Sequence, residues 1–212
     1  MAVQLFEGLD EASLNVLGEA STVRKLARGD VLFHEQDEPA ELYVVKSGRI
    51  AMVNRSLDGR ESVVALMEGG DLFGEMPLFD GQSRSTDARA LEPSEVIAIP
   101  YVPLRQIYTN DPSQLWRVVD LLATRLRVMD GVLADSVFLD VTGRTAKRLL
   151  EIAGDADDFS LPVTQEELAG MVGASRERVN KAIASFIKLG WIEQRDRRYH
   201  IINRSQLELR SR

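Results

Sequence analysis

Residues 164–181 read TQEELAGMVGASRERVNK, and this stretch predicts the fold of the last third of the chain. Thr164 and Glu167 have the spacing of a capping box, in which each side chain accepts a hydrogen bond from the other residue's backbone N–H. The pair predicts a helix that starts after Thr164 and ends at a Gly-Ala turn. Ser175 is an N-cap residue for a second helix, which extends to Leu189. Two capped helices joined by a short glycine turn are typical of a helix-turn-helix.

A hairpin with a basic tip is predicted directly after these helices. Residues 190–193 and 199–202 are short strand-like runs that flank Arg195-Asp196-Arg197-Arg198. The hairpin makes the C-terminal module a winged helix-turn-helix. The charge of the chain is also uneven, because residues 1–143 hold 13 Lys and Arg against 23 Asp and Glu, whereas residues 144–212 hold 13 against 10. This asymmetry suggests two domains, of which the second is a candidate for an anionic partner.

The second helix carries side chains suited to reading bases. Val179, Ile183 and Phe186 lie on one face and are expected in the core. The candidate base readers are Arg176, Glu177, Arg178, Asn180 and Lys181. The i,i+4 pairs Arg176–Asn180 and Glu177–Lys181 are expected to share one exposed side of the N-terminal half of the helix. Arg and Lys donate to guanine O6 and N7, and Glu accepts from cytosine N4. The candidate phosphate anchors are Thr164, Ser175, Arg197 and Arg198. The alternative is a solvated face on which Glu177 and Lys181 form an ordinary i,i+4 pair.

The first hundred residues predict short strands separated by turns. The expected strands are residues 22–27, 31–33, 41–46, 49–55, 61–67, 84–92 and 95–99, and a short helix over residues 10–20 precedes them. Asp58-Gly59 lies between two strands and is a strong hairpin signal. Many short strands with glycine turns indicate an antiparallel barrel or sandwich, and the lack of alternation with helices argues against a doubly wound sheet. Together with the C-terminal helices, this gives an α+β fold.

One long helix is predicted between the strands and the winged helix-turn-helix. Asp111 can cap this helix, with Pro112 at its first position. Seven positions from Leu115 to Ser136 follow alternating steps of four and three residues, and six of them are apolar, which is a heptad seam. A helix of about 27 residues would be about 40 Å long. The seam predicts a parallel homodimer, and packing within the monomer is the alternative.

The domain organisation follows from these changes of pattern. Asp140 caps a further helix over residues 141–153, and residues 154–158 form an acidic linker. The prediction is an antiparallel barrel or sandwich over residues 1–110, a long dimerisation helix over residues 111–139, and a DNA-binding winged helix-turn-helix over residues 140–212.

Composition excludes several classes of protein. The chain has no cysteine, which excludes disulfides, thiolate nucleophiles and Cys-ligated metal centres. His34 and His200 are its two histidines, which argues against a multi-histidine metal site or a Ser-His-Asp triad. No stretch approaches the ~18 apolar residues of a membrane span. The N-terminus has no basic segment followed by an apolar one, so we expect no secretory signal and a cytoplasmic protein.

Three separated motifs carry a resemblance to a known family. They are Phe73-Gly74-Glu75-Met76-Pro77-Leu78 followed by Arg84-Ser85, then Phe138-Leu139-Asp140-Val141-Thr142-Gly143-Arg144, and Val172-Gly173-Ala174-Ser175-Arg176-Glu177-Arg178-Val179. They resemble the phosphate-binding cassette, the hinge and the recognition helix of the Crp/Fnr superfamily of bacterial transcription factors. The order of the motifs over about 200 residues makes the resemblance specific, and Val179-Asn180-Lys181-Ala182 resembles the actinobacterial branch.

The resemblance implies that residues 1–110 form a jelly-roll-like antiparallel β-roll and that residues 111–139 form the dimerisation helix and hinge. It also implies a cyclic-nucleotide site built from the cassette. Arg84 would bind the cyclic phosphate with its guanidinium fork, and Ser85 would add a hydroxyl donor. Glu75 would accept the ribose 2′-OH, Gly74 would let the backbone approach the ligand closely, and Met76 completes the motif. Without the resemblance, Arg84 and Glu75 would be read as a simple ion pair.

Two residues of the long helix depart from the family's best-known member, in which two hydroxyl side chains contact adenine. The aligned residues are Met129, which cannot replace a hydroxyl, and Asp130, which only accepts hydrogen bonds when ionised. Asp130 suits the paired N1–H and N2–H₂ donors of guanine. The resemblance favours cAMP as the effector, with cGMP and no required ligand as alternatives. No obligatory cofactor is expected.

The predicted function is allosteric regulation of transcription by a homodimer that binds TGTGA-like palindromes in double-stranded DNA. A ligand would shift the long helix and the hinge over residues 138–143, which would set two recognition helices about 34 Å apart. Lys181 stands where many relatives have Arg, which puts bidentate base recognition there in doubt. RNA polymerase is a further candidate partner. The alternative to DNA binding is a cyclic-nucleotide sensor that acts on a partner protein. A nucleotide hydrolase is not expected, because the cassette lacks metal ligands and a side chain placed to act as a general base.

Overall fold

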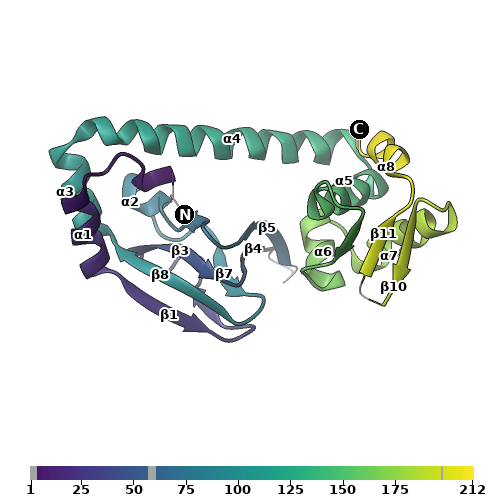
Figure 1. The fold of residues 1–212 in the computed structure, drawn as a ribbon, viewed down its shortest axis with the longest axis horizontal. Helices are drawn as coiled ribbons and strands as arrows, with labels where there is room; N and C mark the ends of the chain where they lie inside the picture. The colour runs from purple at the N-terminus through teal and green to yellow at the C-terminus, as the bar shows by residue number, and fades with distance from the viewer. Residues whose placement is uncertain (1–3, 57–60, 197) are drawn as a thin grey trace. The chain divides into compact units, whose positions relative to one another are not determined.

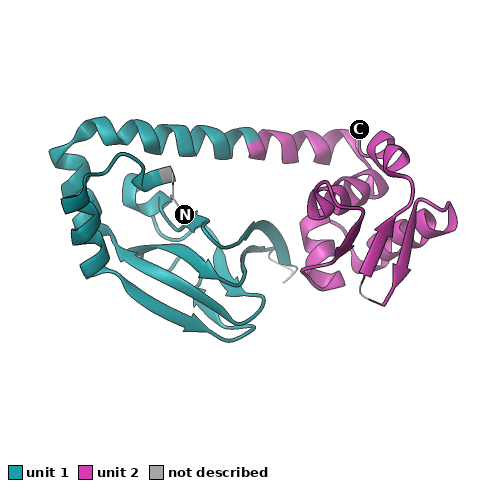
Figure 2. Ribbon diagram, in the orientation of Figure 1, with its two compact units in different colours: residues 1–127 teal, residues 128–212 magenta. Residues whose placement is uncertain are grey.

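The computed structural model describes residues 4–56, 61–196 and 198–212, and the chain forms two compact units (Figure 2). Unit 1 comprises residues 1–127 and unit 2 comprises residues 128–212. The boundary lies inside the long helix α4 (Leu115–Phe138), so this helix contributes residues to both units.

Unit 1 is built on two four-stranded antiparallel sheets (Figure 1). The strand order is β1-β8-β3-β6 in the first sheet and β2-β7-β4-β5 in the second. The strands are β1 (Thr22–Leu26), β2 (Val31–Phe33), β3 (Glu41–Ser47), β4 (Ile50–Arg55), β5 (Glu61–Met67), β6 (Leu72–Phe73), β7 (Asp87–Ala90) and β8 (Ser94–Pro100). Phe33, Ile50 and Phe73 belong to one core that draws residues from both sheets. The sheets therefore pack against each other as a β-roll.

Strand β3 shows why the first sheet is apolar on both faces. Tyr43 and Val45 lie in the core between the sheets, whereas Leu42 and Val44 lie in a second core. Successive side chains of a strand point to opposite faces, so this strand is a continuous apolar run. The second core is completed by residues of helices α1 (Glu11–Ala20), α2 (Met76–Asp80), α3 (Tyr101–Asn110) and α4, and of the short 3-10 helix η1 (Gln4–Phe6).

The sequence-based prediction of the β-roll and of the α+β fold class is confirmed, with corrections to individual elements of unit 1. Helices α2 and α3 were not predicted. Asp111 caps the 3-10 helix η2 (Pro112–Gln114) and α4 begins at Leu115, so the predicted start of the long helix at Pro112 is wrong. The strand predicted over residues 84–92 is shorter, because the chain before Asp87 is a loop. The predicted Asp58-Gly59 turn lies outside the described residues, although β4 and β5 pair on either side of it.

Unit 2 contains the predicted winged helix-turn-helix. Its elements after α4 are α5 (Val141–Ala153), β9 (Asp158–Ser160), α6 (Gln165–Val172), α7 (Arg176–Lys188), β10 (Ile192–Arg195), β11 (Arg198–Ile201) and α8 (Arg204–Arg210). The strands form an antiparallel sheet of order β10-β11-β9. Leu149, Leu168, Phe186 and Leu207 lie in a single core that includes residues of all four of these helices. The sequence did not predict β9, which begins inside the expected acidic linker, or α8.

Local hydrogen bonds fix the helix starts of unit 2 as predicted. The capping box is present, since Glu167 N donates to Thr164 Oγ1 over 3.2 Å and Thr164 N donates to Glu167 Oε2 over 2.7 Å. Ser175 Oγ accepts from the N–H three residues later over 3.4 Å. Gly173 has φ +67°, a left-handed conformation that glycine adopts without steric cost and that ends α6.

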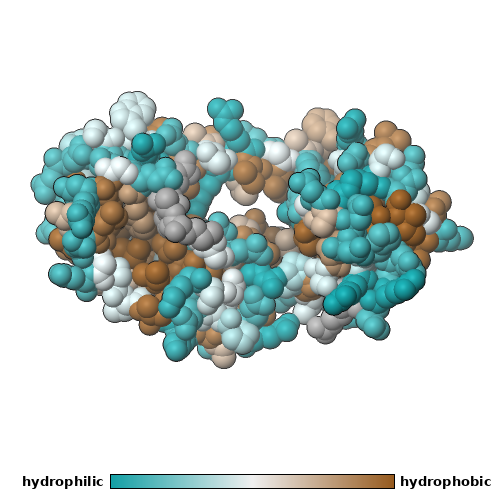
Figure 3. Space-filling model, viewed as in Figure 1, coloured by the Kyte–Doolittle hydropathy of each residue, from teal (hydrophilic) through white to brown (hydrophobic). Residues whose placement is uncertain are grey.

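Helix α4 exposes many of its apolar side chains. Leu126, Leu133 and Phe138 are 62%, 64% and 82% exposed. In Figure 3 hydrophobic residues (brown) reach the surface along the middle of this helix. Within the described part of the chain, no helix combines the length and hydrophobicity that a membrane span requires. The seam positions Leu122, Leu126, Met129 and Leu133 are therefore among the exposed side chains of α4.

Candidate functional site

The cassette of unit 1 begins where β6 ends and α2 starts. Gly74 has φ +74°, a conformation that an L-residue rarely adopts, and Glu75 precedes the first turn of α2 as its N-cap residue. Pro77 lies near the start of α2, where its missing N–H leaves no hydrogen bond unmade. These residues turn the chain sharply and bury the Glu75 side chain completely.

Arg84 is a buried cation with an incomplete set of partners. The residue is 5% exposed, and its guanidinium lies 4.2 Å from the centre of the Phe33 ring. Nη1 donates to Gly74 O over 2.8 Å and to the Tyr101 hydroxyl over 3.1 Å, and Nη2 donates to Glu41 O over 2.6 Å. The Nε donor is also buried and has no hydrogen-bond partner among the described residues. A charged side chain is thus held in place while one of its donors remains free.

Gly74 and Tyr101 complete the surroundings of this guanidinium. A Cβ at Gly74 would lie 2.6 Å from Arg84 Nη1, so a residue with a side chain cannot stand there without moving the arginine. The Tyr101 hydroxyl donates to Gly74 O, which joins the start of α3 to the cassette. Burial raises the pKa of Tyr101 to about 12, so the hydroxyl remains a donor at neutral pH.

Glu75 is paired with a residue that the sequence did not point to. Arg125 Nη1 donates to Glu75 Oε1, and Arg125 Nη2 donates to Leu72 O. The simple ion pair between Arg84 and Glu75, considered from the sequence, is therefore replaced by a pair between Glu75 and α4. The second carboxylate oxygen, Oε2, is buried and has no partner among the residues that the structure describes.

The remaining ligand candidates lie in different settings. Ser85 and Met76 are exposed beside the cassette. Met129 and Asp130 are exposed on the part of α4 that belongs to unit 2. The structure therefore brings together Gly74 and Arg84, with Glu75 next in the chain, and the ligand-binding roles of all seven candidates stay predictions.

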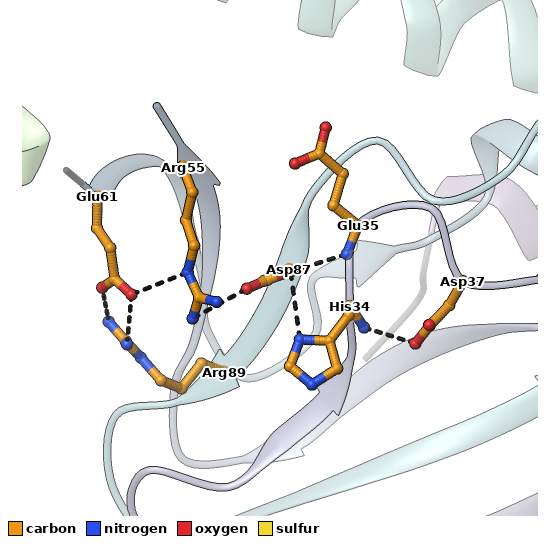
Figure 4. Close-up of polar contacts among 7 residues, drawn as sticks. All are labelled: His34, Glu35, Asp37, Arg55, Glu61, Asp87 and Arg89. Atoms are coloured by element: carbon orange, nitrogen blue, oxygen red, sulfur yellow. Dashed lines mark hydrogen bonds and ion pairs between the residues drawn. The ribbon is translucent and has the colours of Figure 1, made fainter. Parts of the chain in front are cut away.

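A separate group of charged residues lies on the second sheet of unit 1 (Figure 4). Arg55 Nη2 lies 3.2 Å from Asp87 Oδ2, and Arg55 Nε lies 3.2 Å from Glu61 Oε1. Arg89 pairs with the same Glu61 over 2.8 Å, and His34 Nδ1 lies 3.5 Å from Asp87 Oδ1. The Glu61 and Asp87 carboxylates therefore already contact arginine or histidine side chains. We interpret this group as an ion-pair network across the sheet and not as a candidate ligand site.

Helix α7 presents most of its candidate base readers to solvent. Arg176, Glu177, Arg178 and Lys181 are exposed, and Lys181 Nζ lies 2.7 Å from Glu177 Oε1. The hydrogen bond and charge of Lys181 lower the pKa of Glu177, which keeps this carboxylate an acceptor. Asn180 departs from the predicted exposed position, because it is half-buried and its Oδ1 is buried with no partner within the described chain. The expected core face of Val179, Ile183 and Phe186 is confirmed.

The candidate phosphate anchors lie at helix starts and in the wing. Thr164 and Ser175 are exposed cap residues whose oxygens accept backbone hydrogen bonds, so their hydroxyl hydrogens can still be donated to a phosphate. Arg198 is exposed at the start of β11. Arg197 lies outside the described residues. The wing strands pair from Ile192–Ile201 to Arg195–Arg198, one to two residues nearer the tip than predicted.

Comparisons with known proteins identify the family. The cyclic nucleotide-binding domain matches residues 23–111, and the Crp-like helix-turn-helix domain matches residues 143–210. A CRP-like cAMP-activated global transcriptional regulator of Mycobacterium tuberculosis is 34% identical over 215 residues, which cover 98% of this chain and 96% of the relative. The chain belongs to the Crp/Fnr superfamily of transcription regulators. The three motifs read from the sequence are therefore those of a DNA-binding regulator with a cyclic-nucleotide-binding domain.

One further relative and two solved structures also match along most of the chain. The cAMP-activated global transcriptional regulator CRP of Salmonella typhimurium is 33% identical over 168 residues, which cover 76% of this chain and 80% of the relative. FixK2 from Bradyrhizobium japonicum shares the fold with a TM-score of 0.81 at 21% identity, covering 91% of this chain and 98% of that protein. The c-di-GMP responsive regulator CLP of Xanthomonas campestris has a TM-score of 0.78 at 25% identity, covering 91% and 99%. The named effectors differ among these relatives, so membership of the superfamily does not decide the effector.

Proposed function

We propose that this chain is a homodimeric DNA-binding regulator controlled by a cyclic nucleotide. The observation that carries the proposal is a buried donor, Arg84 Nε, together with a buried acceptor, Glu75 Oε2, neither of which has a partner in the described chain. Leaving such groups unsatisfied costs about 1–3 kcal/mol each, and more when they are charged. A cyclic nucleotide offers an anionic phosphate oxygen to the donor and a ribose hydroxyl to the acceptor.

The neighbours of Arg84 support this assignment. Its two Nη atoms are held by Gly74 O, Glu41 O and the Tyr101 hydroxyl, so the guanidinium is orientated before a ligand arrives. A preorganised group loses little conformational entropy on binding. In the proposal the exposed Ser85 hydroxyl adds a second phosphate donor, and Met76 and Gly74 line the approach.

We propose cAMP as the effector, because the relatives from Mycobacterium tuberculosis and Salmonella typhimurium are named as cAMP-activated. The exposed carboxylate of Asp130, next to Met129, supports cGMP as the second candidate, since an ionised carboxylate pairs with the guanine donor edge. A dimer that binds DNA without a ligand is the third. The assay below separates the three.

The exposed seam of α4 supports a parallel homodimer. Leu122, Leu126, Met129 and Leu133 follow heptad spacing and are 39–64% exposed in the single chain. Burial of apolar area contributes about 25 cal/mol per Å², so a second copy of the same helix is favoured as its cover. Leu126→Glu should shift the protein to monomers in sedimentation velocity, whereas Val137→Glu, outside the seam, should not.

We assign DNA recognition to residues 140–212, ligand binding to residues 1–110, and dimerisation and hinge movement to residues 111–139. Base reading is assigned to Arg176, Glu177, Arg178, Asn180 and Lys181, and phosphate contacts to Thr164, Ser175, Arg197 and Arg198. In a two-state switch, differential contacts of the ligand with the two states shift their populations. RNA polymerase is proposed as a further partner of the DNA-bound dimer.

Fluorescence anisotropy with a labelled TGTGA-N6-TCACA duplex and a scrambled duplex tests this function. Titrations are made without nucleotide, with cAMP and with cGMP. Specific binding that requires cAMP supports the proposal, and binding that requires cGMP favours the guanine nucleotide as effector instead. Equal specific binding in all three conditions would show a ligand-independent regulator. Equal binding of the TGTGA duplex and the scrambled duplex would overturn the proposal that TGTGA palindromes are the target.

Variants of the cassette connect the DNA assay to the proposed site. Arg84→Gln removes the buried charge, and Glu75→Gln keeps the size of the side chain but weakens its acceptor. Both should lose the nucleotide response while retaining nucleotide-independent, salt-dependent DNA contacts. Arg89→Gln is the matched control, because it breaks an ion pair of the second sheet outside the cassette. A normal response in Arg84→Gln would contradict the assignment.

A further inference from the structure

Helix α8 ties together the two ends of α5 within unit 2. At the start of α8, Arg204 donates to Gly154 O over 2.8 Å and to Ala156 O over 2.6 Å, in the loop after α5. At its end, Arg210 contacts Asp140, the cap residue before α5. Leu207, between the two arginines, is fully buried. The two helices are therefore antiparallel neighbours with an arginine contact at each end.

The Arg210 contact is made at the junction between α4 and α5. Asp140 Oδ1 accepts from Gly143 N over 2.8 Å, and both carboxylate oxygens accept from Arg210 Nη2. The backbone of α8 also comes close, since a Cβ at Gly143 would lie 3.0 Å from Arg210 O and 3.1 Å from its Nη1. The last turn of α8 is thus packed against the first turn of α5.

Two further side chains of α5 connect this junction to the helix-turn-helix and to α4. Arg144 donates from Nη1 to Leu139 O over 2.7 Å and from Nε to Val172 O over 2.9 Å, at the end of α6. Lys147 Nζ lies 2.6 Å from Asp135 Oδ1 on α4. The direction in which the chain enters the DNA-reading helices therefore depends on a small set of polar contacts, of which the Arg210 pair is contributed from α8.

We propose that Arg210 is a positioning residue that fixes the angle of the α4–α5 junction and, through it, the placement of α7 on DNA. This inference rests on the proposed function. A dimer binds a palindrome tightly only when both recognition helices reach their half-sites at once, which raises the effective concentration of the second contact. A looser junction widens the range of half-site spacings that the dimer accepts and weakens binding at the best spacing.

Hydrogen exchange in the full chain tests the junction directly. Arg210→Gln should raise amide exchange in residues 139–144 about ten-fold, and Arg210→Lys should restore most of the protection. Arg204→Gln is the matched control, because it removes the same charge from the other end of α8 and should raise exchange only in residues 154–157. Unchanged exchange at residues 139–144 in Arg210→Gln would overturn the proposal.

The dependence of DNA affinity on half-site spacing provides a second test, because a general loss of protein stability would not change the preferred spacing. Affinity is measured for TGTGA palindromes with spacers of five, six and seven base pairs. Arg210→Gln should lower the preference for the best spacer about five-fold, and Arg204→Gln should retain the wild-type preference. The same preference in Arg210→Gln and wild type would overturn the positioning role. If wild type binds none of these palindromes, the proposed DNA target fails, and the exchange experiment alone decides the role of Arg210.

Discussion

Replacing Gly74 by alanine tests whether the cassette is built around the Arg84 guanidinium. The residue has φ +74°, and the added methyl group would lie 2.6 Å from Arg84 Nη1 and 3.4 Å from Tyr43 Cδ2. Real Cβ atoms do not approach a neighbour as closely as 2.6 Å, so the guanidinium must move. Its contacts with Gly74 O and the Tyr101 hydroxyl are then lost or lengthened.

Gly81 provides a control with the same backbone strain and no contact. Its φ is +69°, and no described atom lies within 4 Å of its Cβ position. A left-handed L-residue costs about 1–2 kcal/mol, which is the expected loss of unfolding free energy for Gly81→Ala. Gly74→Ala should lose the same amount and, in addition, at least one hydrogen bond to a charged group worth about 1.5–3 kcal/mol, which gives about 2.5–5 kcal/mol in total.

Native-state hydrogen exchange of the β3 amides measures this difference, because it reports the opening free energy of unit 1 separately from unit 2. Calorimetric titration with cAMP and cGMP gives the second readout. Gly74→Ala should weaken nucleotide binding more than ten-fold, and Gly81→Ala should leave it within two-fold of wild type. Equal losses of stability in the two variants, with unchanged nucleotide affinity, would refute the role given to the Gly74–Arg84 approach.

Three other predictions concern pairs described above. Arg125→Gln leaves the buried Glu75 carboxylate without its cation and should lower the unfolding free energy of unit 1 by about 2–3 kcal/mol. This loss is smaller than the loss expected for a fully buried ion pair, because Arg125 is partly exposed. Hydrogen exchange of the β3 amides measures the loss, with Arg127→Gln, at an exposed position, as the control. Glu177→Gln should raise the Kd for the TGTGA palindrome about 5–100-fold, and an equal loss on scrambled DNA in anisotropy would contradict base reading. A backbone N–H three residues on lowers the pKa of Asp140 below its ordinary value of 3.8, so its contribution to stability is present above pH 3.8 and is lost as the pH falls below it. Asp140→Asn should therefore flatten the pH dependence of unit 2 stability in urea titrations below pH 3.8, and an unchanged slope there would contradict this prediction.

The sequence predicted best those features that depend on residues close together in the chain. The caps at Thr164, Ser175 and Asp140 are hydrogen bonds across three residues, so residue type and spacing suffice to find them. The burial of Val179, Ile183 and Phe186 follows from helical periodicity in the same way. These local patterns were enough to define the helix-turn-helix and the side of α7 that carries its exposed charges.

The missed features depend on contacts between distant parts of the chain. Arg125 pairs with Glu75 across 50 positions, and Tyr101 reaches Gly74 across 27, so only the fold brings these partners together. Helix α8 has seven residues and buries only Leu207 deeply, which leaves too little periodicity for a prediction. Arg125 could not be singled out from the sequence, because arginines that only contact solvent are common on helix surfaces.

The contact between Asp140 and Arg210 means that residues 140–210 begin and end at the same point in space. A protein module whose ends meet can be spliced into a surface loop of an unrelated host, or circularly permuted, with only short connections at each joint. The DNA-binding module of this regulator therefore has the geometry of a domain that can be transferred to another protein. Residues 140–212 follow α4 directly at Asp140, so joining this module to a different N-terminal partner would need a new connection at one position only.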